Sequence, residues 1–472
     1  MNKTKIIATI GPSSDHPHII SKLIKSGMNV ARINMAHCKD RAYLKNIIST
    51  IRLESKKLDV HIGILMDLAG PKIRLDLHSS SSNDIEVKKN HVYQLGYSKM
   101  NDLSINVDLV FKNIYSNNSY VKVDDGKINF KIIKSDGKSV TIKALDDGIL
   151  KNNKGVNFPG VEIDVPCVTS KDITDIKYAI EENVDWLALS FVRNAEDIQP
   201  IKDILEENNY NIPIIAKVEK PEAIDNLDKI IHNFDGVLVA RGDLGVEMPL
   251  SKLPGLQKSI IDKCRHAKKP VIIATQMLES MINQNQPTRA EVTDVANAVY
   301  QGSDAVMLSG ETAIGSYPIE TVDIMKEIII NAEEEDYHFK KDKEININII
   351  NDNRCAIGNA IKAINKSIDI DAIVIMTESG STSVVVSHFR PTASLYALTP
   401  HQNICKRLTL IWGVVPIITP KFLSTDDMIV NAEKILKNKN FIKKDDVFIL
   451  TSGVPVGITG STNMLKIHKV ND

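Results

Sequence analysis

Residues 214–220 read IIAKVEK and residues 235–247 read DGVLVARGDLGVE, with a helix-like run between them. The apolar run in each stretch is typical of a short buried strand that ends in polar residues. In an extended chain Lys217 and Glu219 point to the same side, and Asp243 follows the second strand among glycines. Two carboxylates and one ammonium at adjacent strand ends suit a hard divalent cation beside an anionic substrate. A surface ion-pair cluster is the alternative, but two successive strand ends of this kind favour a functional site.

The composition indicates a multidomain protein with ordinary cores. The chain has 472 residues, of which 43% are apolar, and this length is enough for about three domains. Its 58 Lys and Arg balance 59 Asp and Glu, which argues against a general role on nucleic acid or a membrane surface. Five scattered cysteines without a CxxC pair favour a reduced compartment and no structural zinc. No apolar run has the length of a signal peptide or a membrane span, so we expect a soluble, cytoplasmic protein.

Strand-like and helix-like runs alternate on both sides of the opening stretch. Strands are expected at 5–10, 28–33 and 61–66 with helices between them, and the alternation returns at a helix that starts near residue 169. One later connecting helix is expected over 222–232. Eight strand–helix units result, which is the number that closes a (β/α)8 TIM barrel. In the alternative, an open doubly wound sheet, the polar strand ends should gather at one switch point, whereas here they are spread over nearly all units.

Two further domains interrupt and follow the barrel pattern. The interruption has short β-like runs and Asp-Gly turns, which predicts a small inserted, β-barrel-like lid domain. A charged, asparagine-rich break at 333–353 precedes an alternation of helices and strands that is typical of an α/β sheet domain. We therefore expect the barrel at 1–71 and 163–340, the lid at 72–162 and the C-terminal α/β domain at 341–472.

Polar residues from most strands should meet at the barrel face where active sites of this fold lie. They are Thr9, Arg32, Asn34, Asp67, Lys217, Glu219, Asp243, Thr275, Ser309 and Glu311. Arg32 offers a planar fork to phosphate oxygens, and Lys217 can neutralise charge while a phosphoryl group moves. Glu219 and Asp243 supply only two carboxylates, which fits Mg²⁺ because this ion also takes waters and substrate oxygens. Backbone N–H groups at Gly242–Leu244 could hold a substrate carboxylate if a helical turn starts there.

Several of the other polar residues have an ordinary structural alternative. Thr275 or Ser309, taken singly, would be a structural hydroxyl. No Walker A or GxGxxG motif is present, so a nucleotide needs other ligands, and the insert offers Arg74 and Lys154. Lys154 could equally be an ordinary exposed lysine, and spacing alone does not decide between the two.

A hydroxyl-rich run joins a strand to a helix in the C-terminal domain. Its members are Thr377, Ser379, Gly380, Ser381 and Thr382. Hydroxyls and free N–H groups at a helix N-terminus can bind an anion. An ordinary helix cap is the alternative, and the sequence alone favours it.

A series of motifs along the chain resembles those of the pyruvate kinase family. They include TKIIATIGPSS at 4–14, VARINMAH at 30–37, MDLAGPKIR at 66–74, KGVNFPG at 154–160, IIATQMLESM at 272–281 and MLSGETAIGSYP at 307–318. The order of domains is similar too, so the resemblance covers essentially the whole chain. It implies a cytoplasmic enzyme that moves the phosphoryl group of phosphoenolpyruvate to ADP, yielding pyruvate and ATP in the last step of glycolysis.

The resemblance also implies roles for the strand-end residues. Lys217 would stabilise the phosphoryl group during its transfer, and Arg32 would bind it. Glu219 and Asp243 would hold Mg²⁺ or Mn²⁺, and the substrate would also contact Gly242, Asp243 and Thr275. The proton relay to the enolate would contain Thr275, Ser309 and Glu311. The nucleotide phosphates would bind at Asn34, His37, Arg74 and Lys154. The loop 377–382 would bind a phosphorylated effector, and the family is usually homotetrameric.

Two other classes of function remain to be weighed against this resemblance. A metal-dependent lyase or aldolase of pyruvate enolate would share the arginine and the two acids, but it would not need a lid with Lys154. A catalytically silent binding module should have lost Lys217 or a metal-binding acid. All of these residues are present in the chain.

One departure from the commonest family pattern concerns potassium. Members that need K⁺ hold it with an asparagine, a serine, an aspartate and a threonine, near a glutamate, and the matching positions here are Asn34, Ala36, Asp67, Leu68 and Lys72. Both hydroxyl ligands are absent, and the ammonium of Lys72 replaces a negative charge. We therefore expect that this chain does not require K⁺.

Overall fold

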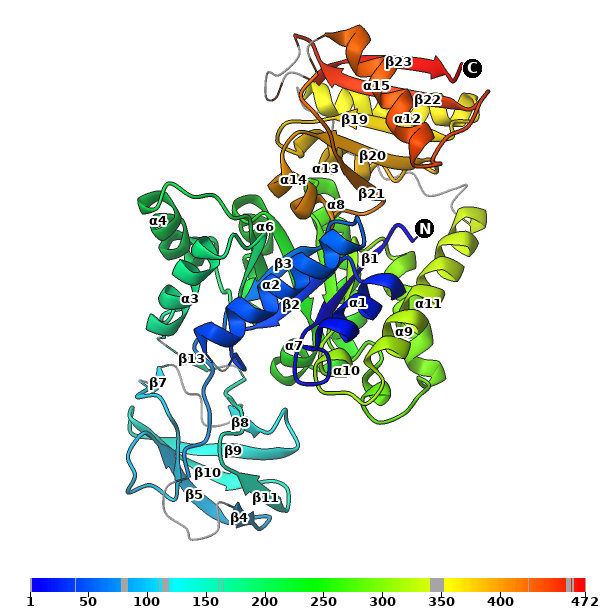
Figure 1. Ribbon diagram of the computed structural model, residues 1–472. Helices are drawn as coiled ribbons and strands as arrows, with labels where there is room; N and C mark the ends of the chain where they lie inside the picture. The colour runs from blue at the N-terminus through cyan, green and yellow to red at the C-terminus, as the bar shows by residue number, and fades with distance from the viewer. Residues whose placement is uncertain are drawn as a thin grey trace.

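The molecule consists of three bodies in a row, which Figure 1 shows as an insert, a central barrel and a C-terminal domain. The computed structural model describes residues 2–38, 40–77, 84–109, 111–112, 119–159, 161–163, 165–339, 352–422, 424–455, 460 and 462–471. The N-terminus lies at the barrel and the C-terminus on the C-terminal domain. Among the helices that are described, none combines the length and the apolar character that crossing a membrane would require.

Eight parallel strands close the central barrel in the order β1-β18-β17-β16-β15-β14-β3-β2. They are β1 (Lys5–Thr9), β2 (Val30–Asn34), β3 (Gly63–Asp67), β14 (Trp186–Leu189), β15 (Ile214–Val218), β16 (Gly236–Ala240), β17 (Val271–Ala274) and β18 (Ala305–Leu308). The predicted TIM barrel is confirmed, and the open-sheet alternative is excluded. Because all strands are parallel, their carboxyl ends share one rim.

Helices surround the barrel and connect its strands. The longer ones are α1 (Pro17–Ser26), α2 (Arg41–Lys57), α3 (Ser170–Glu181), α4 (Gln199–Glu207), α6 (Leu227–Asn233), α8 (Leu253–Ala267), α9 (Arg289–Tyr300) and α11 (Pro318–Phe339). The short ones are α5 (Pro221–Asp225), α7 (Arg241–Glu247), α10 (Gly310–Ala313), η1 (Ala195–Ile198), η2 (Leu250–Lys252) and η3 (Glu279–Ile282). The helix predicted over 222–232 is divided into α5 and α6 at Asn226, whose side-chain amide donates to Glu222 O and Arg193 O. An asparagine that bonds local carbonyls in this way competes with the helical backbone.

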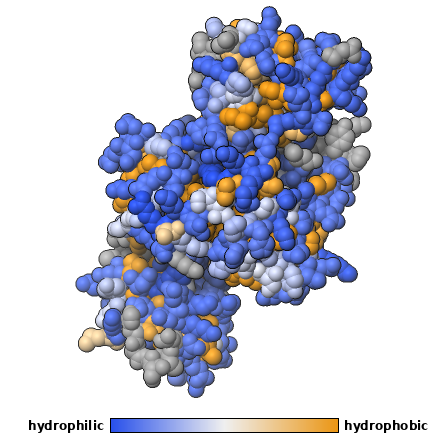
Figure 2. All heavy atoms as spheres, in the orientation of Figure 1, coloured by the Kyte–Doolittle hydropathy of each residue, from blue (hydrophilic) through white to orange (hydrophobic). Residues whose placement is uncertain are grey.

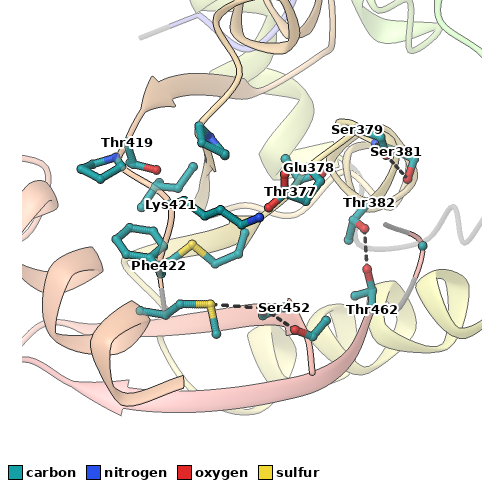
Figure 3. Close-up of a pocket in the computed structure, with 17 residues that line it drawn as sticks. Thr377, Glu378, Ser379, Ser381, Thr382, Thr419, Lys421, Phe422, Ser452 and Thr462 are labelled. Carbon is teal, nitrogen blue, oxygen red and sulfur yellow. Dashed lines mark hydrogen bonds between the residues drawn. The ribbon is translucent and has the colours of Figure 1, made fainter. Parts of the chain in front are cut away.

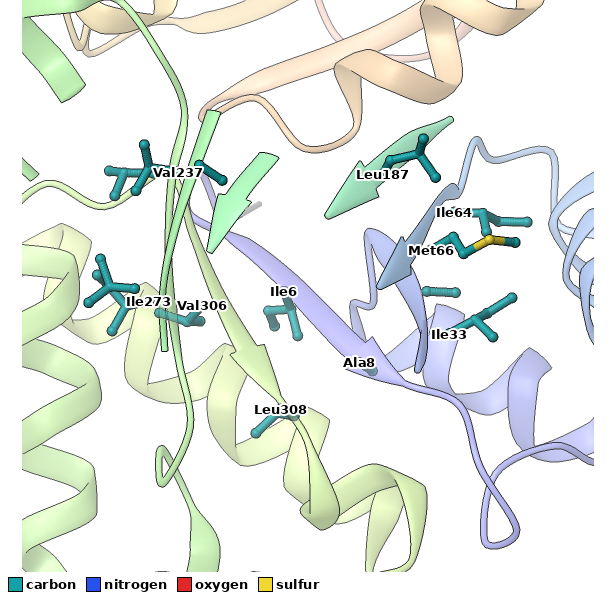
Figure 4. Close-up of a cluster of buried hydrophobic side chains, with 14 of the residues drawn as sticks. Ile6, Ala8, Ile33, Ile64, Met66, Leu187, Val237, Ile273, Val306 and Leu308 are labelled. Atoms are coloured by element: carbon teal, nitrogen blue, oxygen red, sulfur yellow. The ribbon is translucent and has the colours of Figure 1, made fainter. Parts of the chain in front are cut away.

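The largest hydrophobic core lies between the barrel strands and these helices. Ile6, Ile64, Val237 and Ile273 are each 0% exposed there, and Figure 4 shows such side chains from several strands. Parallel strands that are covered on both faces have continuous apolar sequences, so these strands could be predicted from the sequence. Burial of one such side chain contributes about 1.5–3 kcal/mol.

The insert is a set of short strands with a core of its own. They are β4 (Asp84–Val87), β5 (Val92–Gly96), β6 (Leu103–Ser104), β7 (Phe111–Lys112), β8 (Tyr120–Val123), β9 (Ile128–Ser135), β10 (Ser139–Ala144), β11 (Gly148–Lys151), β12 (Val156–Asn157) and β13 (Glu162–Ile163). Six of them form a curled sheet in the order β12-β8-β9-β10-β5-β6. Phe130, Ile132 and Ile142 fill its core at 0% exposure. The expected turns at Gly126 and Gly137 have φ of 83° and 90°, which glycine tolerates readily.

The C-terminal domain is an α/β layer with a mostly parallel sheet. Its elements are α12 (Asn353–Ser367), β19 (Ala372–Met376), α13 (Ser381–His388), β20 (Ser394–Thr399), α14 (Gln402–Leu408), β21 (Val414–Ile418), α15 (Thr425–Asn438), β22 (Val447–Gly453) and β23 (Thr462–Lys469). The sheet order is β21-β20-β19-β22-β23, and only the β22–β23 pair is antiparallel. The predicted boundary at 340/341 lies outside the described residues. On the face shown in Figure 2, hydrophilic residues predominate and hydrophobic residues form small groups on all three bodies.

Candidate active site

The insert contacts the helix that follows one barrel strand at the rim. Lys122 Nζ donates to Val246 O at 2.6 Å, and Asn157 Nδ2 donates to Glu247 Oε1 at 2.9 Å. Both acceptors belong to α7, which directly follows β16. The insert is therefore placed as expected of a lid beside the mouth of the barrel.

Arg32 is held in place at the end of β2 by a buried carboxylate. Its Nε and Nη2 donate to Asp67 Oδ2 at 2.8 and 2.5 Å, and its Nη1 donates to Thr9 Oγ1 at 2.9 Å. Arg32 is 7% exposed and Asp67 only 1%. Burial alone would raise the pKa of Asp67, but the charges of Lys217 and Arg32 outweigh burial and keep this pKa below its ordinary value. Asp67 is thus ionised and fixes the orientation of the guanidinium.

Lys217 reaches the same carboxylate from β15. Its Nζ lies 3.2 Å from Asp67 Oδ1 and 2.9 Å from Glu219 Oε1, and it donates to Ser190 Oγ at 2.7 Å. Burial acts to lower the pKa of Lys217, but Asp67 and Glu219 oppose it and raise the pKa overall. The ammonium therefore remains charged in a site largely shielded from water, where its electrostatic effect is strong.

The two acids predicted to bind a metal lie beside this ammonium. Glu219 is 1% exposed, and its Oε2 accepts the N–H of Phe191 at 2.8 Å. Burial and the nearby charge of Asp243 raise the pKa of Glu219 against the opposing effect of Lys217. Within the described part of the chain, no three acidic, histidine or cysteine side chains gather into a complete metal site. The donor set fits an ion such as Mg²⁺, which completes its shell with water and substrate oxygens.

Thr275 adopts an uncommon backbone conformation at the end of β17. Its φ is 69°, in the left-handed region that β-branched residues rarely enter. Its Oγ1 accepts the N–H of Gly242 at 2.7 Å and donates to Ala274 O at 2.6 Å. A strained hydroxyl residue locked to the glycine after the neighbouring strand β16 is typical of a functional position.

Ser309 and Glu311 follow β18, as expected. Glu311 is 0% exposed, and its carboxylate accepts the N–H groups of Ser309 at 2.7 Å and Leu278 at 3.2 Å. These two bonds tie the turn after β18 to the segment after β17. Glu311 therefore supports the loop that carries Thr275.

Comparison with known proteins decides the family. Residues 1–322 match the family model described as pyruvate kinase, barrel domain, and residues 355–468 match the one described as pyruvate kinase, alpha/beta domain. This chain belongs to the pyruvate kinase family. The pyruvate kinases of Staphylococcus aureus strains MRSA252 and USA300 are both 41% identical over 481 residues, which cover 100% of this chain and 81% of each relative. The crystal structure of a pyruvate kinase from Cryptosporidium parvum is 32% identical with a TM-score of 0.90, covering 99% of this chain and 96% of that one. The predicted family and the predicted class, a phosphotransferase, are confirmed.

His37, one of the residues expected to bind nucleotide, lies near several cationic side chains. Burial and the charges of Arg74, Lys72 and Arg32 all lower the pKa of His37, so this histidine lies within reach of three positive charges. Arg74 Nη1 donates to Asn153 O at 2.9 Å, and Lys154 Nζ pairs with Asp124 Oδ1 at 2.8 Å; both pairs lie within the insert.

The region matching the potassium site contains Asn34, Asp67 and Lys72. Asn34 Oδ1 accepts the N–H of Ala36 at 3.1 Å, so this amide caps its own turn. Lys72 Nζ lies 3.8 Å from Asp243 Oδ1. The ammonium therefore neighbours one of the acids proposed to bind the divalent ion.

The hydroxyl-rich loop of the C-terminal domain lines a pocket of about 50 Å³ (Figure 3). Gly380 has a φ of 83°, and its N–H donates to Thr377 Oγ1 at 2.9 Å. Within the loop, Ser379 Oγ bonds Ser381 Oγ at 3.1 Å, and Thr382 Oγ1 bonds Thr462 Oγ1 at the start of β23 at 2.6 Å. No helix-capping bond is made by the side chain at the cap position, because that residue is the glycine.

Sequence reasoning missed two residues after β14, Ser190 and Phe191. Ser190 is 2% exposed and contacts Lys217, while Phe191 has a φ of 57° and donates its N–H to Glu219. Only its position could have indicated Ser190, because it directly follows the apolar run WLAL, a predicted strand. In contrast, Arg241, which follows β16, does not pair with Glu219 or Asp243, because its guanidinium bonds Asp294 and Thr275 O at 2.7 Å each.

Proposed function

We propose that the rim of the barrel transfers the phosphoryl group of phosphoenolpyruvate to ADP through Arg32, Lys217, Glu219 and Asp243. The observation that supports this most directly is the cationic pair Arg32 and Lys217, which share one buried carboxylate beside two acids. A lyase of pyruvate enolate would need the acids, but it has no phosphoryl group for two fixed cations to stabilise.

In this reaction the bond between phosphorus and the enol oxygen breaks, and a bond forms to a terminal oxygen of ADP. Negative charge spreads over the three equatorial phosphoryl oxygens during transfer, so positioned cations supply most of the catalysis. Arg32 can offer N–H groups to these oxygens, while Lys217 carries a compact charge beside the path of transfer. Both cations are fixed by Asp67 before substrate arrives, so little reorganisation is needed.

Glu219 and Asp243 would hold Mg²⁺ or Mn²⁺, which supplies Lewis-acid charge to substrate oxygens when bound. The substrate carboxylate would be held by the N–H groups of Asp243 and Leu244 in the first turn of α7, since the N–H of Gly242 already donates to Thr275 Oγ1. The enolate left by phosphoryl transfer takes a proton at its methylene carbon and becomes pyruvate. Thr275, Ser309 and Glu311 would form the relay that delivers this proton, and the Glu311 carboxylate supports the loop that carries Thr275. Asn34, His37, Arg74 and Lys154 hold the nucleotide phosphates between barrel and lid.

The same chain is proposed to act without K⁺. Ala36 and Leu68 provide no hydroxyl oxygen, and Lys72 adds a positive charge near Asp243. A resident ammonium repels an alkali ion and replaces part of its electrostatic effect on anionic substrates.

The pocket in the C-terminal domain is proposed to bind a phosphorylated effector that changes the affinity for phosphoenolpyruvate. The N-terminus of α13 and the hydroxyls of loop 377–382 suit a phosphate. Lys421 also lines the pocket, and the buried Thr419 Oγ1 has no partner among the described residues. Family membership alone supports a cytoplasmic homotetramer.

The test is a coupled assay for pyruvate formed from phosphoenolpyruvate and ADP with Mg²⁺. The proposal expects turnover that requires all three components and stops when the divalent ion is chelated. Pyruvate release without ADP, or no turnover in any cation, contradicts it.

A further inference from the structure

A serine outside the predicted set makes the shortest contact to the Lys217 ammonium. Ser190 Oγ lies 2.7 Å from Nζ, compared with 2.9 Å for Glu219 Oε1 and 3.2 Å for Asp67 Oδ1. An ammonium has three N–H donors, so these three acceptors account for all of them. The position of Nζ is therefore defined by three separate elements, the ends of β3, β14 and β15.

The orientation of the serine hydroxyl is itself fixed. Ser190 Oγ donates to Leu68 O at 2.7 Å, so its lone pairs are left to accept from the ammonium. Cys167 Sγ lies 3.3 Å from Ser190 O, and the serine is 2% exposed. A buried hydroxyl with its own proton committed to a carbonyl is a directed acceptor.

The three acceptors differ in what else they do. Asp67 is shared with Arg32, and Glu219 is proposed to bind the divalent ion. Each carboxylate also cancels part of the ammonium's charge, which weakens its effect on the phosphoryl group. Ser190 is the neutral acceptor among the three, so it can hold Nζ without reducing the charge.

We infer that Ser190 is a positioning residue that holds the Lys217 ammonium in line with the phosphoryl group during transfer. The inference rests on the role proposed above for Lys217. Ser190 is needed most when Glu219 is engaged elsewhere, because the ammonium then keeps only Asp67 and the serine. Its loss should affect the transfer step more than substrate binding, for which Arg32 and the acids remain.

The test compares Ser190→Ala with wild type in steady-state turnover. We expect kcat to fall about 10-fold or more, which corresponds to one charged hydrogen bond, while KM for phosphoenolpyruvate changes less than about 3-fold. Ser190→Thr keeps the hydroxyl and should restore most of kcat. If Ser190→Ala does not fold, Ser190→Cys takes its place in the test. Cysteine has nearly the size of serine but is a poor hydrogen-bond acceptor, so the same loss of kcat is expected.

Measuring a second reaction step distinguishes a positioning role of Ser190 from a general loss of active-site structure. Exchange of the methyl protons of pyruvate with solvent does not move a phosphoryl group, so Ser190→Ala should lose much less of this activity than of phosphoryl transfer. Ser303→Ala is the matched control, because Ser303 is 0% exposed and its Oγ donates to Ala298 O away from the site. We expect that control to keep wild-type kcat.

Three results would overturn the inference: kcat of Ser190→Ala within 2-fold of wild type, equal losses in exchange and transfer, or a threonine variant no better than alanine. Absence of turnover in the wild-type enzyme would instead refute the proposed function, so the two failures are distinguishable.

Discussion

At the scale of single residues, the site is organised by one buried carboxylate, Asp67. Asp67 accepts two bonds from Arg32 and lies 3.2 Å from Lys217, so it keeps two like charges near one another. Two cations in this proximity would repel strongly without a shared anion. The arrangement is therefore charged and oriented before substrate binds, which is how electrostatic catalysis lowers a barrier.

We expect turnover of this chain not to depend on K⁺. Turnover measured without Na⁺ or K⁺, with ionic strength balanced by a bulky organic cation, should be close to its value with K⁺ added. Lys72→Glu should lower turnover, because it removes the positive charge beside Asp243, and K⁺ should rescue it poorly since Ala36 and Leu68 offer no hydroxyl oxygen. Lys134→Glu, at an exposed position on β9 of the insert, is a matched control that should keep wild-type turnover. Strong activation of the wild type by K⁺ would refute this account.

Residue types at strand ends, and which of them share a face of one strand, could be predicted from sequence, but their contacts with other elements could not. Lys217 and Glu219 share a face because strand periodicity is 2, and that expectation needs no structure. Arg241 follows a strand in the same way, yet it bonds Thr275 O and Asp294. A lone serine such as Ser190 carries no distinct pattern, and its contact with Lys217 depends on the packing of β14 beside β15.

At the scale of elements, each strand–helix unit could be predicted from the sequence, because the hydrophobic periodicity of a strand or helix depends only on nearby residues. The strand expected at 28–33 begins at Val30 instead, because Gly27 and Met28 complete the end of α1 with bonds to Leu23 O. The left-handed conformation of Thr275 could not be foreseen, because sequence preference assigns such positions to glycine or asparagine. Tertiary contacts at the rim override that preference.

The loop 377–382, which precedes α13, is expected to bind a phosphorylated effector. A panel of sugar phosphates and nucleoside monophosphates should contain at least one compound that shifts the phosphoenolpyruvate saturation curve of the wild type. Ser379→Glu should abolish that shift, because a carboxylate repels a phosphate at the same loop, and it should leave turnover at saturating substrate unchanged. Lys434→Glu, at an exposed position on α15, serves as the charge-change control and should keep the shift. A flat response of the wild type to the whole panel would remove the regulatory proposal.

At the scale of the whole molecule, the barrel and the C-terminal domain meet at a joint formed by Arg390, Trp412 and Asp304. Arg390 Nη2 pairs with Asp304 Oδ1 at 3.0 Å and donates to Gly302 O at 2.9 Å, and its guanidinium stacks on Trp412. Asp304 directly precedes β18, whose other end carries Ser309. The joint thus lies at the opposite end of a barrel strand from the active site.

Acid should loosen this joint through His388, which is 2% exposed and has no partner on either ring nitrogen among the residues that the structure describes. Burial is the main cause that lowers its pKa from 6.5 to about 4, and nearby Asp304 opposes it. Between these pH values the unfolded chain binds a proton that the folded chain does not, so stability is lost as pH falls from 6.5 to 4. The loss is on the order of 3 kcal/mol at most.

The measurement is the free energy of unfolding between pH 4 and 7 for wild type, His388→Gln and His18→Gln. The His388 variant should show a shallower pH dependence than wild type, while the exposed His18 variant should keep the wild-type slope. Parallel curves for all three proteins would contradict the prediction.

The role proposed for Lys217, stabilising the phosphoryl group during transfer, is tested by Lys217→Met. Formation of pyruvate from phosphoenolpyruvate and ADP is measured together with the melting temperature and the affinity for Mn²⁺. We expect kcat to fall about 10²–10³-fold or more, with folding and metal affinity nearly unchanged, because the charge matters mainly during transfer. Turnover of this variant close to that of wild type would contradict it.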